Sequence, residues 1–168
     1  MNKGSHATDI DRYESLAGAM HRWIDGLSPA DLDAHPVPGT WSMRELLLHM
    51  LDSDLVYGHR MRKIAAEKRP LLMGYDETLF AQTPALQAGD PKGLATIFEL
   101  HRKWIAAFLR ALPEDAWTRD GVHSERGMVT ISKLVATMIE HVSHHEKFAA
   151  AKRDKLGKPM RELAGAGR

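Results

Sequence analysis

Hydrophobic residues recur every three to four positions along four long stretches of the chain, which is the period of an amphipathic α-helix. The four predicted helices cover about 8–26, 42–67, 91–111 and 130–155. Thr8 is a plausible N-cap for the first of them. Ser42, followed three residues later by Glu45, has the pattern of a capping box at the start of the second. Strand patterns are nearly absent, and the one extended candidate lies at about 118–129.

Four helices with one wide apolar face each bury those faces most simply against one another, as a bundle. The connections 68–90 and 113–129 are too long for tight turns, and long connections in a compact domain usually have a function. We therefore predict an all-α four-helix bundle with long crossover connections and a minor extended segment before the last helix. We expect one domain over 1–168, with a loosely held tail at 157–168 because Gly157 and Pro159 end the last helix.

The composition of the chain limits the classes of binding partner that we expect. The 168 residues suit one domain with a real core, and 43% hydrophobic with 27% charged residues is an ordinary proportion for such a domain. The net charge is +1, and no basic stripe with interleaved aromatic residues indicates nucleic-acid binding. No apolar stretch is long enough to span a bilayer and no signal segment is evident, so we predict a cytoplasmic protein without a membrane partner. Cysteine is absent, which leaves histidine and carboxylates as metal donors.

Two histidines in the middle of the last predicted helix are candidate metal ligands. His141 and His145 are four residues apart, so their imidazoles share one face of the helix and fall among its apolar positions. Burying unpaired polar rings costs about 1–3 kcal/mol each, and a shared cation would avoid that cost. His49, at the shoulder of the second helix's apolar stripe, is a candidate third ligand. The spacing alone leaves open that these histidines are simply hydrogen-bonded or solvated.

Other residues have weaker signals. His101 lies in the middle of the third helix's apolar stripe, where a lone histidine is more often satisfied by a hydrogen bond. Asp52, three residues after His49, is placed to orient a ring or a bound water, or is an ordinary surface acid. The chain has no glycine-rich phosphate loop and no Gly-x-Ser-x-Gly turn. It also lacks the repeated Glu-x-x-His motifs of di-iron bundles.

An ordered set of motifs resembles the DinB/YfiT-like superfamily of metal-binding four-helix bundles. The resemblance covers about 38–157 and rests on four segments. They are Trp41-Ser42-Met43-Arg44 continuing to His49 and Asp52-Ser53, then Tyr75-Asp76-Glu77, then Leu100-His101-Arg102-Lys103-Trp104, and finally His123-Ser124-Glu125-Arg126-Gly127 before the His141 and His145 pair. The chain departs from one branch of the family at Asp54, where that branch often has histidine.

The resemblance implies that His49, His141 and His145 bind a divalent ion, most often zinc or nickel, with water in its remaining positions. It also implies a homodimer. The activities known in the family are mostly thiol-dependent transfers, with metal-dependent hydrolysis as a broader description. A low-molecular-weight thiol is therefore a possible second cofactor.

Together these observations predict a metal-dependent enzyme that acts on a small molecule, by hydrolysis with activated water or by S-transfer with an activated thiol. Asp52 and His101 are the candidate catalytic residues, as proton acceptors or as support for a metal ligand. Tyr75 and Asp76 are the candidate substrate-binding residues, from the long connection. The alternative is a non-catalytic module, either a metal-stabilised bundle or a binder of small ligands.

Overall fold

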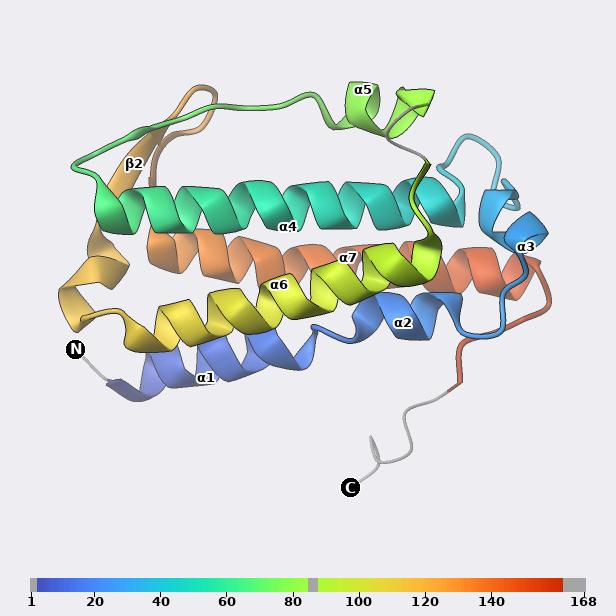
Figure 1. Ribbon diagram of the computed structural model, residues 1–168, viewed down its shortest axis with the longest axis horizontal. Helices are drawn as coiled ribbons and strands as arrows, with labels where there is room; N and C mark the ends of the chain where they lie inside the picture. Colours follow the sequence, from blue (N-terminus) through green and yellow to red (C-terminus); the bar gives the residue numbers. More distant parts are fainter. Residues whose placement is uncertain (1–2, 85–87, 162–168) are drawn as a thin grey trace.

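The four stretches with a helical period form the four members of a helix bundle (Figure 1). The computed structural model describes residues 3–84 and 88–161. The bundle members are α1 (Lys3–Ser15) with α2 (Ala19–Ile24), α4 (Met43–Ala66), α6 (Pro91–Ala111) and α7 (Ile131–Lys155). The predicted all-α bundle is therefore confirmed.

The first member consists of two helices, where the sequence pattern predicts one. α1 already begins at Lys3, so Thr8 lies inside the helix and is not its N-cap. The helix is interrupted by a tight turn, in which the amide of Ala17 donates to the carbonyl of Glu14 at 2.9 Å and that of Ala19 to Leu16 at 3.1 Å. Gly18 is in this turn, and glycine is a poor helix former. Apolar positions continue on one side through both helices, which is why periodicity did not reveal the break.

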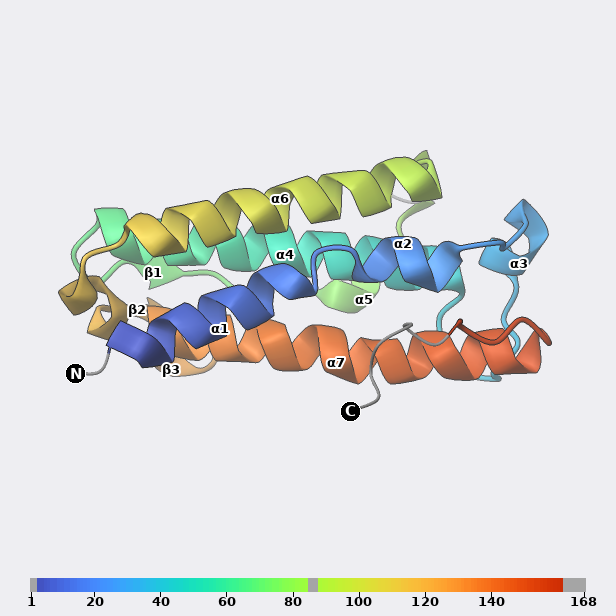
Figure 2. The same ribbon diagram turned by 90° about the horizontal axis from the view of Figure 1, so that it is seen from below.

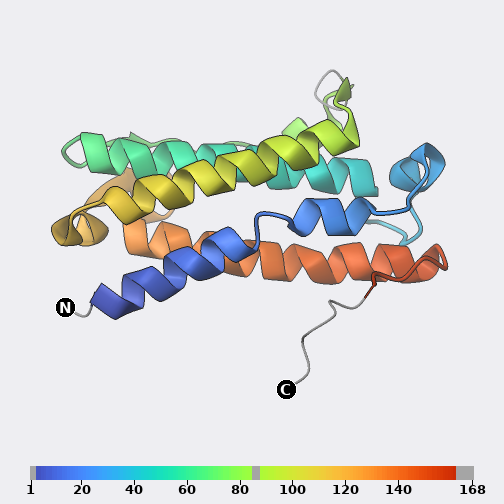
Figure 3. The same cartoon turned by 60° about the horizontal axis from the view of Figure 1, so that its bottom comes forward.

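The two middle members run in the same direction. Figures 1 and 2 show α4 and α6 parallel to each other and opposite to α7 and to the α1–α2 pair. The chain between α4 and α6 must therefore travel back along the length of the bundle. This crossover contains β1 (Leu71–Leu72) and α5 (Glu77–Gln82), and α5 lies outside α4 on the side toward α7 (Figure 2). The short helix α3 (Pro29–Asp33) joins α2 to α4 at the far end of the bundle (Figure 3).

The second long connection stays at one end of the bundle. It contains the 3₁₀ helix η2 (Glu114–Thr118) and the strands β2 (Asp120–His123) and β3 (Gly127–Thr130). β2 pairs antiparallel with β3 and parallel with β1, in the order β1-β2-β3. The extended segment predicted at 118–129 is thus present as a hairpin. β1 was not predicted, because two residues are too few to show an alternating pattern.

The start of α4 follows the predicted capping box. The amide of Glu45 donates to the Ser42 hydroxyl at 3.2 Å, and the amide of Ser42 donates to the Glu45 carboxylate at 2.6 Å. Two otherwise unpaired backbone donors are satisfied in this way. The cap fixes the first turn of α4. His49 is on the same helix, six residues after its first residue, Met43.

A cluster of polar side chains is buried where α1, α4, α6 and α7 meet. We call Tyr13, Asp54, His101 and Arg102 the buried polar cluster. The Asp54 carboxylate accepts from His101 Nδ1 at 2.6 Å and from the Tyr13 hydroxyl at 3.3 Å, and lies 3.6 Å from Arg102 Nε. The Arg102 guanidinium lies 3.9 Å from the centroid of the Tyr13 ring and donates to the carbonyl of Met138 at 3.3 Å. One carboxylate therefore connects three helices, and its cationic partner reaches the fourth.

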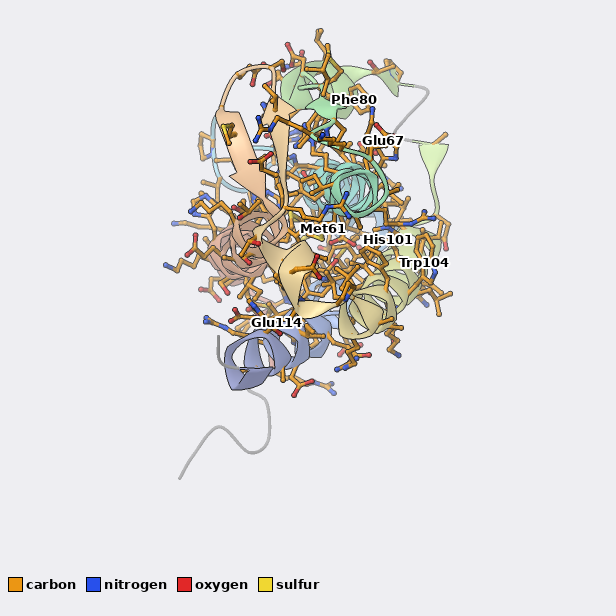
Figure 4. All side chains as sticks on the ribbon, turned by 90° about the vertical axis from the view of Figure 1, so that its left-hand side faces the viewer. Met61, Glu67, Phe80, His101, Trp104 and Glu114 are labelled. Atoms are coloured by element: carbon orange, nitrogen blue, oxygen red, sulfur yellow. The ribbon has the colours of Figure 1, made fainter. Side chains whose placement is uncertain are left out.

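Burial is complete at the charged members of this cluster. Asp54 and Arg102 both have 0% exposure. Burial raises the pKa of the Tyr13 phenol, and the neighbouring Asp54 charge adds to the effect. His101 projects from α6 toward α4, whereas Trp104 lies on the outer side of α6 (Figure 4). A side chain at Gly58 of α4 would meet the His101 ring at 2.6 Å, so glycine allows the two helices to approach there.

The tail makes contacts at its beginning. Lys158 Nζ forms an ion pair with Asp31 of α3, and Met160 packs against the apolar core at that end of the bundle. Residues 162–168 of the tail lie outside the described residues. Across the described ranges, no helix combines the length and the apolar character needed to cross a bilayer.

We predict that Asp54→Ala destabilises the fold by about 3–5 kcal/mol, because it leaves the Arg102 charge buried without a partner. Urea unfolding at neutral pH measures the change. The matched control is Asp11→Ala, which removes a 71%-exposed carboxylate that pairs with Arg110. The control should change stability by less than about 1 kcal/mol. Equal effects of the two substitutions would show that the buried pair does not hold the helices together.

Candidate metal centre

Three histidine side chains from two helices converge in the bundle. His49 Nε2 of α4 lies 3.0 Å from His141 Nε2 and 3.1 Å from His145 Nε2, both of α7. We call His49, His141 and His145 the three-histidine cluster, and one ligand atom from each lies within 4.8 Å of the others. The three residues that the sequence singled out as metal ligands are therefore brought together, including the one that is 92 positions away from the pair.

Helix geometry explains the convergence. His141 and His145 are about one turn apart on α7 and point to the same side. His49 is only 3% exposed, and the Trp41 ring packs against it with 4.8 Å between ring centroids. The capping box at Ser42 fixes where α4 begins, and His49 lies in the second turn of that helix, on the side that faces α7.

The distances fit a divalent ion. An ion bound about 2.0–2.1 Å from each nitrogen separates two ligands by about 2.9 Å at a right angle and about 3.4 Å at the tetrahedral angle. The distances of 3.0 and 3.1 Å from His49 Nε2 to the other two nitrogens fall within this range. A single N–H on His49 could satisfy only one of its two neighbours, whereas an ion would satisfy all three nitrogens.

The protonation state also suits a ligand set. Burial lowers the pKa of His49 to about 4, of His145 to about 3 and of His141 to about 2. Repulsion between the rings adds to the effect at His141 and His145. All three imidazoles are therefore neutral at neutral pH, and neutral imidazole has the lone pair that binds a metal.

The outer nitrogens of the three rings lack hydrogen bonds. In the part of the chain that the structure describes, Nδ1 of His49, His141 and His145 is buried without a hydrogen-bond partner. A candidate partner for His49 is Glu77 at the start of α5, whose Oε2 lies 3.8 Å from His49 Nδ1. A carboxylate at the outer nitrogen of a histidine ligand fixes its tautomer and strengthens it as a donor. Residue roles inferred from sequence did not include Glu77, because an exposed acid in a connection has no periodic signal.

The predicted residues of the crossover lie over α4. The Tyr75 hydroxyl shares a 2.7 Å hydrogen bond with the Ser53 hydroxyl. Burial raises the pKa of Tyr75 to about 12, with smaller contributions from the charges of Glu77 and Asp52. Asp76 is exposed and caps α5, accepting from the amide of Leu79 at 2.9 Å. Tyr75 thus faces the bundle, while the contact found for Asp76 belongs to the local helix start.

The two residues predicted to assist catalysis lie in different places. Asp52 follows His49 by about one turn on α4, and burial raises the pKa of its carboxyl group. His101 contacts Asp54 and Gly58 in the interface between α4 and α6. Gly58 is nine residues after His49, about half a turn around the helix axis from it. His101 therefore belongs to the buried polar cluster, and the structure does not bring it to the three-histidine cluster.

A groove adjoins the three-histidine cluster. This cavity of about 270 Å³ is lined by His145 together with side chains that include Trp41, Phe148 and Lys152. A larger cavity elsewhere, between α2 and α6, contains none of the three histidines. The smaller cavity lies next to the candidate metal ligands, and we call it the aromatic groove.

Comparison with known proteins assigns this bundle to a class. The profile of the DinB superfamily matches residues 12–149, most of the chain, and the protein belongs to that family. Among individual relatives, YfiT of Bacillus subtilis, named as a proposed metal-dependent hydrolase, is 25% identical over 138 residues, covering 81% of this chain and 77% of YfiT. A Bacillus pumilus protein with the same proposed activity is 29% identical over 137 residues, covering 81% of this chain and 78% of its own length.

A solved structure of Bacillus subtilis YfiT has the same fold. The two chains superimpose with a TM-score of 0.86 at 20% identity, over 94% of this chain and 90% of YfiT. That structure is described as a four-helix bundle of unusual topology. The predicted family resemblance is confirmed by the profile and by this fold.

We predict that the purified protein takes up one zinc or nickel ion per chain and that His49→Ala weakens binding more than about 100-fold. Loss of a residue that only supports a ligand costs about 10–100-fold, and loss of a ligand should cost more. Elemental analysis after dialysis gives the stoichiometry, and competition with a chromophoric chelator gives the affinity. The control is His59→Ala, an exposed histidine of the same helix. Unchanged binding in His49→Ala would exclude the three-histidine cluster as the site.

Proposed function

We propose that the protein is a metal-dependent enzyme that hydrolyses a small molecule at the three-histidine cluster. The observation that carries the proposal is the convergence of three neutral imidazoles, with His49 Nε2 3.0 and 3.1 Å from Nε2 of His141 and His145, beside a groove of about 270 Å³. Three protein ligands leave positions of an ion open, and a divalent ion in such a site lowers the pKa of bound water or thiol toward neutrality. The names of the relatives agree with this activity.

The surrounding residues have separate tasks in this proposal. Glu77 is the residue that would orient His49 through its outer nitrogen, from which the Glu77 carboxylate lies 3.8 Å away. The pKa of Asp52 is raised by burial, which brings its carboxyl group closer to the range useful for proton transfer. Of the two predicted proton acceptors, we assign this role to Asp52, since Nδ1 of His101 is hydrogen-bonded to Asp54. Tyr75 stays protonated at neutral pH, so its hydroxyl can hold a polar group of a substrate under α5.

S-transfer is the second form of the same chemistry. The aromatic groove could accept a low-molecular-weight thiol as well as a substrate for hydrolysis, and the family resemblance implies thiol-dependent members.

The non-catalytic alternative is a bundle that an ion merely stabilises. A groove next to the ligands favours an enzyme or a binder of small molecules, since a stabilising site needs no such opening. The homodimer and the cytoplasmic location remain predictions from the sequence.

Activity assays distinguish these forms. We expect zinc- or nickel-loaded protein to hydrolyse p-nitrophenyl acetate, or to couple L-cysteine to chlorodinitrobenzene, and to lose that activity on chelation. Activity should return when the metal is restored, because the imidazole ligands remain in place. His49→Ala should be inactive, and His59→Ala should match the unmodified protein. If chelation lowers the melting temperature but no substrate of either class reacts, the non-catalytic alternative replaces this proposal.

The role proposed for Glu77 has its own test. Glu77→Gln should weaken zinc binding about tenfold, the lower end of the range for residues that support a ligand, because its side chain is 46% exposed. Competition with a chromophoric chelator measures the change. The control is Glu67→Gln, which removes an exposed carboxylate just after the last residue of α4 (Figure 4). This substitution should leave the zinc affinity unchanged. Equal zinc affinities for the two variants would remove Glu77 from the site.

A further inference from the structure

The aromatic groove contains a charged group that the proposed chemistry does not use. Lys152 lies on α7, about two turns after His145 and therefore on nearly the same side of the helix. It is only 2% exposed and lines the groove together with His145, Trp41 and Phe148. A lysine is rarely buried to this extent without a carboxylate partner.

The structure shows how the ammonium group is held. Lys152 Nζ donates to the Thr40 hydroxyl at 2.7 Å. That hydroxyl in turn donates to the carbonyl of Val37 at 2.9 Å, so it meets Lys152 as an acceptor. An ammonium group has three hydrogens, and this contact uses one of them.

Within the described part of the chain, the ammonium group has no direct ion-pair partner. Among the described residues, no carboxylate lies within ion-pair distance of Lys152. The acid whose charge acts on Lys152 is Glu45, and its carboxylate is already bonded to the Ser42 amide and to His35 Nε2. Burial lowers the pKa of Lys152, as expected for a cation that lacks a close counter-ion.

The rest of the groove is suited to an apolar body. The Trp41 ring packs on His49, and the Phe148 ring lies 5.8 Å from that of His145, measured between centroids. Phe148 is 41% exposed, which leaves much of its surface available to a ligand. Aromatic side chains therefore lead from the three-histidine cluster to the buried cation.

We propose that the aromatic groove binds a substrate that has a carboxylate at one end, paired with Lys152, and an apolar body against Trp41 and Phe148. The reacting group of such a substrate would lie toward the three-histidine cluster. A single cation with a neutral hydroxyl beside it suits a monoanion, whereas a phosphate dianion usually meets several donors or cations. This inference rests on the proposed function and adds the class of substrate to it.

The rival explanation is structural. In that explanation, the hydrogen bond from Lys152 to Thr40 only stabilises the position of the segment before α4. Lys152→Gln separates the two explanations, because glutamine keeps a donor for Thr40 but has no charge. Lys152→Met removes both the donor and the charge. Lys147→Met provides a matched control, since Lys147 is exposed on the same helix and does not line the groove.

The probes are phenylacetate and its neutral analogue phenylacetamide, titrated by calorimetry into zinc-loaded protein. We expect the unmodified protein and Lys147→Met to bind phenylacetate at least about tenfold more tightly than phenylacetamide, as a charge-assisted hydrogen bond allows. Lys152→Gln and Lys152→Met should lose most of this preference. Equal binding of the two probes by the unmodified protein would overturn the inference. A carboxylate preference that persists in Lys152→Gln would overturn it too, because the carboxylate would then be bound by zinc alone.

Zinc content, measured in the same samples, separates this inference from the proposed function. Protein that retains neither zinc nor nickel contradicts the proposed function itself. Protein with one zinc per chain but no preference for phenylacetate contradicts only the role of Lys152.

Discussion

The buried ion pair between Asp54 and Arg102 determines how the helices are oriented around one another. Both side chains are fully buried, and through Tyr13, His101 and the carbonyl of Met138 they connect all four members of the bundle. Asp54 follows His49 by five residues, which places it about 140° further around α4. Holding Asp54 against α6 and α1 therefore directs His49 toward α7. The geometry of the three-histidine cluster depends on this rotation.

The two buried groups of polar side chains differ in how they are satisfied. In the buried polar cluster, a carboxylate and a guanidinium supply opposite charges, and the carboxylate accepts hydrogen bonds from His101 and Tyr13. Two guanidinium nitrogens, Nε and Nη1 of Arg102, have no hydrogen-bond partner among the described residues, so the cluster is compensated in charge but not in every hydrogen bond. The three-histidine cluster has donors of one kind only, which burial keeps neutral and which face one another. Nothing within the described chain completes it. This contrast is the physical reason for assigning stability to the first group and chemistry to the second.

Sequence patterns predicted the features that depend on local periodicity. The apolar stripes located the bundle helices, and the box at Ser42 and Glu45 located the start of α4. The spacing of His141 and His145 indicated a shared face, the apolar stripe of the second helix made His49 a candidate third ligand, and family motifs supported that choice. Contacts that depend on packing between distant segments could not be predicted from sequence patterns. Neither the approach of Glu77 to His49 nor the burial of Lys152 beside Thr40 leaves a periodic trace. The sequence placed His101 in the apolar stripe of the third predicted helix. It could not show the hydrogen bond to Asp54, because that residue is on another helix.

The parallel course of α4 and α6 has a consequence for access to the site. A helix of 24 residues is about 36 Å long, and an extended chain covers that length in about 10–11 residues. The chain between Ala66 and Pro91 has 24 residues, so more than half of it exceeds what the return journey requires. This surplus supplies α5 and the segment that holds Tyr75 and Glu77 above the histidines. A change in the length of this connection would therefore alter what lies beside His49 without changing the four long members of the bundle.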